Sequence, residues 1–170
     1  MQSNPNTDDF ASWHIVASRS EVVIATWQTI FAVVWRGETS LQGIASLRSA
    51  CSEIASAHPR GIGMLTIIGA SAPLPASAAR KALAQLLAEG SEFIKCSALL
   101  IEGAGFRASA VRSVVTGLTL LAQQAYPHRV CDVDEAVRLF SRHVPCATGE
   151  AISQSALRIS IDQLRQLVQS

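Results

Sequence analysis

Short apolar runs alternate with amphipathic helical patterns along most of this chain. The clearest unit is residues 61–87 (GIGMLTIIGASAPLPASAARKALAQLL), in which the run from Met64 to Ile68 is bounded by glycines. Such a run predicts a strand that is covered on both faces, as in parallel sheets. Pro75 suits the first position of the following helix, where its missing N–H had no intrahelical partner. The apolar stripe of that helix, before Gly90 ends it, consists of Ala79, Leu83, Leu86 and Leu87.

The N-terminal part of the chain predicts an antiparallel hairpin followed by a helix. Residues 21–26 and 29–36 are β-rich and only Trp27-Gln28 separates them, which is too short for a parallel connection. Residues 14–17 add a further strand or a lead-in to the first one. Thr39 and Gln42 form a capping-box pattern for the helix, which stops at His58-Pro59. Its expected apolar face consists of Leu41, Ile44, Leu47, Cys51 and Ile54.

Two further strand and helix pairs are predicted downstream. Residues 95–102 form a strand, residues 107–126 a helix, and residues 129–131 a last short strand. Asp132 and Glu135 then give a second capping pattern. The inward positions of the two helices are Val111, Val114, Val115, Leu118 and either Leu121 or Ala122, then Val133, Val137, Phe140 and Val144. The sequence therefore predicts an α/β fold with a mixed, mostly parallel sheet of about four to six strands, opened by a hairpin and covered by four helices.

The chain divides into a flexible tail (residues 1–11), an α/β domain (12–145) and a C-terminal helical extension (146–170), with a linker predicted at residues 145–149. Ser160 and Gln163 form a capping pattern for a helix in the extension. That helix must bury its stripe, either on its own domain or on a second copy of the chain. We predict a homodimer in which residues 150–170 make contacts. The stripe consists of Ile161, Leu164, Leu167 and Val168.

Composition excludes several classes of protein. The 170 residues are 49% apolar with a net charge of +1, and no cluster of Lys and Arg suggests nucleic-acid binding or a polybasic membrane anchor. No apolar run approaches the roughly 18 residues of a membrane span. The N-terminus is polar, so we expect a cytoplasmic protein. The cysteines lack metal-ligand spacing, so we expect reduced thiols and no metal site; they are Cys51, Cys96, Cys131 and Cys146.

The order of the elements from Trp13 to Val144 resembles the STAS family of anti-sigma-factor-antagonist-like domains. In that family, a D-S-S-G-like motif opens the helix after the central strand, and a partner kinase phosphorylates its serine. The matching segment here is L-P-A-S-A-A (Leu74 to Ala79), so Ser77 is the nearest serine and Ser71 the next, neither beside an aspartate. The resemblance implies a non-enzymatic regulatory module that docks a protein partner through the surface around residues 69–80.

The same resemblance guides the choice of partner-binding residues. Around the central loop the candidates are Pro73, Pro75 and Arg80. Trp27 is a further candidate, because a tryptophan at a hairpin turn is expected to be exposed and available to a partner. Trp35, by contrast, is expected in the core.

An alternative function is nucleotide or small-ligand binding at the turn from Gly103 to Arg107. Gly103 and Gly105 belong to a G-x-G-x-x-A motif that follows a strand and opens a helix, and Asp132 comes at the end of the next strand. Tight-turn glycines are the competing interpretation. The preferred function needs no cofactor. A further alternative, a lipid-binding relative, requires an apolar cavity.

No catalytic set emerges from the sequence. Glu102 lies at the end of a predicted parallel strand, and we interpret it as a solvated acid. Cys131 has His128 and Asp132 nearby, but neighbouring strand residues point to opposite faces, so a buried thiol is the better interpretation. We interpret the histidines as surface or capping residues; they are His14, His58, His128 and His143.

Overall fold

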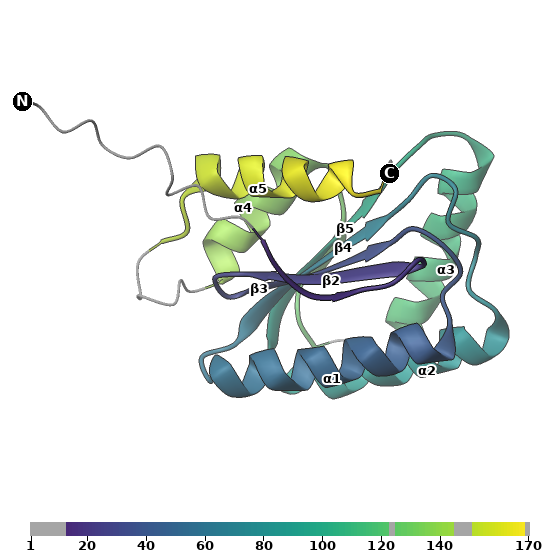
Figure 1. Ribbon diagram of the computed structural model, residues 1–170, viewed down its shortest axis with the longest axis horizontal. Helices are drawn as coiled ribbons and strands as arrows, with labels where there is room; N and C mark the ends of the chain where they lie inside the picture. Colours follow the sequence, from purple (N-terminus) through teal and green to yellow (C-terminus); the bar gives the residue numbers. More distant parts are fainter. Residues whose placement is uncertain (1–12, 123–124, 145–150, 169–170) are drawn as a thin grey trace, which may run out of the picture.

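The computed structural model describes residues 13–122, 125–144 and 151–168. Its strands form a single six-stranded sheet (Figure 1). The pairs β1–β2 and β2–β3 are antiparallel, and the pairs from β3 to β6 are parallel, which confirms the predicted mixed sheet. In sheet order the strands are β1 (His14–Ser18), β2 (Val22–Trp27), β3 (Ile30–Trp35), β4 (Ile62–Ile68), β5 (Ile94–Ile101) and β6 (His128–Val130).

Strand β3 lies inside the sheet and is buried at all six positions. Phe31, Val33 and Trp35 face one layer of helices, and the residues between them face the other, because successive side chains of a strand alternate between the faces. Trp35 is therefore a core residue, as predicted. The predicted hairpin is also confirmed, with the positive φ that its two-residue turn requires at Gln28.

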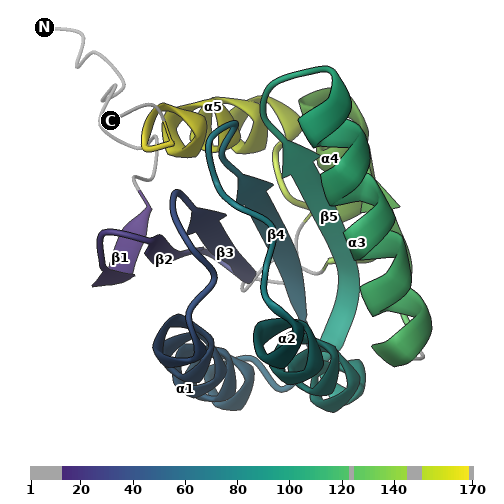
Figure 2. The ribbon, with the colours of Figure 1, turned by 90° about the vertical axis from the view of Figure 1, so that its right-hand side faces the viewer.

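Five helices cover the two faces of the sheet (Figure 2). α1 (Leu41–Ala57), α2 (Ser77–Glu89) and α3 (Phe106–Ala122) lie on one face, and the 3-10 helix η2 (Gly90–Glu92) joins α2 to β5. α3 buries Ala122 and leaves Leu121 exposed, which decides between the two predicted inward positions. α4 (Val133–His143) and α5 (Gln154–Gln166) cover the opposite face.

Helix α1 begins one residue later than its capping pattern predicts. Ser40, not Thr39, is the N-cap, because its hydroxyl accepts a hydrogen bond from the backbone N–H of Gly43 at 2.9 Å. The expected apolar face is otherwise buried, but Leu41 at its start is exposed. At α4 the predicted cap is confirmed: Asp132 accepts from the N–H of Glu135 at 2.8 Å.

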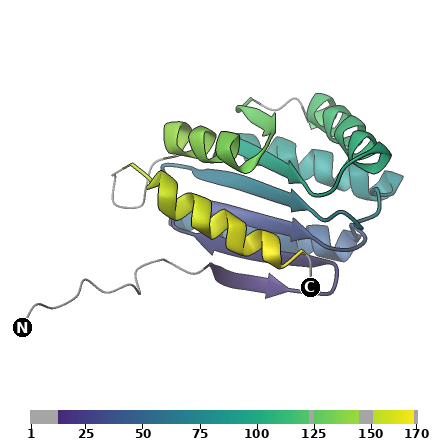
Figure 3. The ribbon, with the colours of Figure 1, turned by 90° about the horizontal axis from the view of Figure 1, so that it is seen from above.

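Helix α5 crosses the sheet on the face opposite α1 and α2 (Figure 3). The side chains of Leu157, Ile161 and Leu164 are almost fully buried in the same core as the strands. The stripe therefore folds back onto its own sheet, one of the two alternatives from sequence. The predicted cap is wrong: Ser153 caps α5, and Ser160 lies buried within the helix because α5 starts about two turns earlier.

Some predictions fall outside the described residues. These are the flexible tail at residues 1–11, the linker at residues 145–149 and the thiol of Cys146. Among the helices of the described ranges, none combines the length and the apolar character needed to cross a bilayer.

Candidate functional site

The loop between β4 and α2 is the segment that the sequence singles out as a docking surface. Its first residues are held in place: the N–H of Gly69 donates to Trp35 O at 2.8 Å, and Ala72 is buried. The chain then turns outward, and Leu74 is 48% exposed. We call the exposed residues of this segment the 71–80 surface; they are Ser71, Pro73, Leu74, Ala76, Ser77, Ala78 and Arg80.

Helix α2 starts at Ser77, so this serine lies in the first turn, as predicted, and it is exposed. Pro75 is not the first helical residue; it precedes the N-cap, Ala76. An alanine has no side-chain acceptor, and no side chain caps this end of the helix. The partial positive charge of the helix N-terminus therefore lies beside an exposed hydroxyl.

A hydrogen bond from α3 fixes the loop from the other side. The guanidinium Nη2 of Arg107 donates to Ala72 O at 2.6 Å. Hydrogen bonds from a charged donor are stronger than neutral ones. The 71–80 surface is thus presented by a loop that is anchored at its base.

Trp27 does not belong to a docking surface. It is only 3% exposed, because Trp13 packs over it with the ring centroids 6.3 Å apart. The indole Nε1 of Trp13 also donates to Ser160 O in α5 at 2.7 Å, which holds this cover in place. The prediction that Trp27 is available to a partner is therefore wrong.

The proposed nucleotide turn is occupied by structural contacts. Gly103 and Gly105 have φ values of +85° and +80°, a conformation that favours glycine and makes the tight turn into α3. Arg107 is engaged with Ala72, and Asp132 caps α4. The geometry therefore favours the tight-turn interpretation of these glycines.

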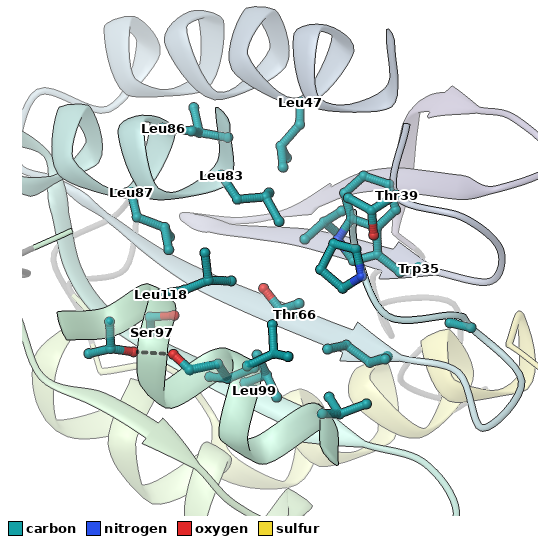
Figure 4. A pocket seen from close by; sticks show the side chains of 18 of the residues that line it. Trp35, Thr39, Leu47, Thr66, Leu83, Leu86, Leu87, Ser97, Leu99 and Leu118 are labelled. Carbon is teal, nitrogen blue, oxygen red and sulfur yellow. Dashed lines mark hydrogen bonds between the residues drawn. The ribbon is translucent and has the colours of Figure 1, made fainter. Parts of the chain in front are cut away.

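An apolar cavity lies between the sheet and helices α2 and α3 (Figure 4). It encloses about 90 Å³. Figure 4 shows Leu83 and Leu87 of α2 and Leu118 of α3 pointing toward it, with Thr66 of β4 between them. None of its lining residues is Asp, Glu, Lys or Arg. The others include Val33, Met64, Ile68, Pro73, Leu74, Pro75, Leu86, Ser97, Leu99, Val111, Val114, Val115, Thr119 and His128.

Two polar residues meet at this cavity. Ser97 and His128 are register partners in β5 and β6, and Ser97 Oγ lies 3.2 Å from His128 Nδ1. Burial lowers the pKa of His128, with a smaller contribution from the charge of Arg129, so the ring is held neutral. His128 Nε2 is buried without a partner among the described residues.

His128 is therefore not the surface or capping residue that its sequence context predicts. Only the parallel pairing of β5 with β6 brings Ser97 and His128 together. The pair is not a catalytic triad: a serine nucleophile requires a histidine that a carboxylate orients, and no carboxylate of the described chain contacts His128 Nε2.

Glu102 is not a solvated acid, which corrects the interpretation from sequence. Arg165 of α5 donates to both of its carboxylate oxygens, from Nε to Oε1 at 2.5 Å and from Nη2 to Oε2 at 3.0 Å. The planar guanidinium matches the two carboxylate oxygens in this forked arrangement. Glu102 therefore ties the end of β5 to α5.

The thiols are poor nucleophiles. Burial raises the pKa of Cys131 to about 11, with the charge of Glu135 as the next contribution, and burial alone raises the pKa of Cys96 to about 12. Asp132 and His128 have the other contacts described above, so they do not activate Cys131. These environments are typical of structural cysteines.

Comparison of the sequence with protein-family models and with curated proteins finds no match.

Proposed function

We propose that this protein is a non-enzymatic regulatory module that docks onto a protein partner through the 71–80 surface. One observation carries the proposal: Leu74, flanked by two prolines, projects from a loop that Arg107 anchors, and it lies close in sequence to the exposed Ser77 and Arg80. An exposed apolar side chain on a fixed loop, with polar residues around it, is typical of a protein-binding surface.

The order of strands and helices supports a STAS-like module, and so does the position of Ser77. A phosphate on Ser77 would add a charge of nearly −2 beside the uncapped start of α2. A favourable contact there stabilises by up to about 2 kcal/mol. Ser71 is the second candidate, in the loop before the helix. Phosphorylation of either serine would change the charge of the surface that meets the partner.

The proposal assigns no catalytic role, cofactor or metal. The candidate nucleophile Cys131 is protonated at neutral pH, and the candidate acid Glu102 is engaged by Arg165. Within the described ranges, no group of three His, Cys, Asp or Glu residues gathers as metal ligands would. These observations favour binding over chemistry.

The proposal also includes a cytoplasmic location and a homodimer. Cys51, Cys96 and Cys131 are unpaired thiols, which are typical of a reducing compartment. The homodimer must use a surface other than the buried stripe of α5, whose Leu157 and Ile161 already contact the sheet. Light scattering across a hundredfold range of protein concentration tests the dimer, and a constant monomer mass would contradict it.

Site-specific photo-crosslinking in the native host tests the docking surface. The photoreactive residue replaces Leu74 in one variant and Ile159 in a matched control; Ile159 is 42% exposed on α5, in the opposite helical layer. We expect a discrete adduct with one protein from position 74 and none from position 159. Equal adduct patterns from both positions would contradict the proposal.

A further inference from the structure

The cavity between α2, α3 and the sheet opens at the loop that carries Leu74. Most of its walls are buried or half-buried, whereas Pro73 and Leu74 both line it and reach solvent. A molecule that enters beside Leu74 meets the leucines of α2 and α3, and then the polar residues deeper inside.

Besides three threonines, the lining has a place where two polar residues meet. Ser97 is 2% exposed, and its hydroxyl is shared with Nδ1 of His128. Since Nε2 of the same ring is buried without a partner in the described chain, it is left with one unused hydrogen bond. A buried polar atom without a partner costs about 1–3 kcal/mol, and a ligand oxygen can recover part of that cost.

The cavity also selects by charge and by size. Its lining includes no ionised side chain, so a carboxylate or an ammonium group would lose its hydration without compensation. An apolar cavity of about 150 Å³ holds benzene. A cavity of about 90 Å³ therefore accommodates a linear chain of about three or four carbon atoms.

We propose that this cavity is a binding site for a small uncharged aliphatic molecule with one hydroxyl end, which meets Ser97 and His128 while its chain lies against Leu83 and Leu118. A hydroxyl group both donates and accepts, so it suits either tautomer of His128. The mouth of this site shares Pro73 and Leu74 with the 71–80 surface, but its interior does not, and neither proposal depends on the other.

Titration of the full chain with 1-butanol, followed by amide chemical shifts in NMR, tests the site. We expect saturable shifts confined to residues that line the cavity, such as Thr66, Ser97 and Leu118. Butanoate at neutral pH, with the same number of carbon atoms and a negative charge, is expected to bind at least tenfold more weakly. Absence of saturation, shifts spread over the surface, or equal binding of butanoate would overturn the proposal.

A pair of variants on α3 tests the chain-binding part of the site, and a substitution of His128 tests the polar part. Leu118→Phe fills the cavity and should abolish binding, whereas Leu120→Phe, at an exposed position of the same helix, should leave it unchanged. If Leu118→Phe fails to fold, Leu83→Phe replaces it. His128→Leu should raise the dissociation constant about 2- to 12-fold, the effect of one hydrogen bond. If the alcohol binds His128→Leu or the cavity-filling variant as tightly as it binds the wild type, the proposed binding site is refuted.

Discussion

Ser97 Oγ and His128 Nδ1 lie 3.2 Å apart, because these residues are register partners in the parallel pair β5–β6. The short strand β6 thereby places an imidazole at a cavity whose other polar lining residues are Ser97 and three threonines. Burial lowers the pKa of His128 below its usual value near 6.5. The unfolded chain therefore binds a proton at this residue more readily than the folded chain.

From this difference we predict how stability depends on pH. Well above pH 6.5, His128 is neutral in both states and contributes no pH dependence. As the pH falls from 6.5 toward the lower folded pKa, the unfolded state gains protons first and the free energy of unfolding decreases. Urea titrations at pH 7.5 and 5.5 should show a larger loss for the wild type than for His128→Phe. An equal loss would show that the folded pKa is not lowered.

The ion pair between Glu102 and Arg165 should couple β5 to α5 weakly but measurably. Arg165 is partly exposed, so solvent screens the pair and we expect a coupling free energy of about 1 kcal/mol. A double-mutant cycle with Glu102→Gln and Arg165→Gln measures it. The coupling should decrease in 1 M NaCl, since salt screens exposed charges. Additive effects of the two substitutions would mean that the pair contributes nothing.

The buried face of α5 should contribute to the stability of the whole domain. Ile161 is fully buried, and Ile161→Ala is expected to lower the free energy of unfolding by about 2–5 kcal/mol. Ile159 lies on the exposed side of the same helix, so Ile159→Ala should change the free energy of unfolding by about 0.5 kcal/mol or less. Similar small effects of both substitutions, measured by urea denaturation, would mean that α5 is not docked on the sheet.

Cys131 should behave as a thiol of high pKa. At pH 8 only about one thiol in a thousand is ionised when the pKa is about 11. We expect its alkylation by iodoacetamide to accelerate about tenfold for each pH unit between 7.5 and 9.5, without a plateau. Mass spectrometry of the tryptic peptide gives the rate. A plateau below pH 9 would instead indicate an activated cysteine.

Local patterns predicted the elements that depend on neighbouring residues. The apolar run from Met64 to Ile68 is a buried strand, Asp132 caps α4, and Ser77 lies in the first turn of α2. Helix α5 is capped by Ser153 and not by the predicted Ser160. Both serines precede apolar residues at helical spacing, and only packing on the sheet decides between them.

Contacts between residues that are far apart in the sequence could not be predicted from local patterns. Trp27 looked exposed because its cover, Trp13, comes from another strand region and is held by Ser160 of α5. Ser97 and His128 are 31 residues apart and meet only through the register of a three-residue strand. The cavity could not be inferred either, since the apolar stripe of α2 looks the same whether its leucines pack fully or leave a space.

The affinity of the partner identified by crosslinking, measured by calorimetry for two matched variants, tests the docking surface most directly. Leu74→Ser removes an exposed leucine of the 71–80 surface, and Ile159→Ser removes a side chain of similar size and exposure from the opposite layer. We expect Leu74→Ser to weaken binding at least tenfold, as for a central apolar contact worth more than about 1.4 kcal/mol, and Ile159→Ser to leave it unchanged. Unchanged affinity of Leu74→Ser, or an equal loss in both variants, would contradict docking through the 71–80 surface.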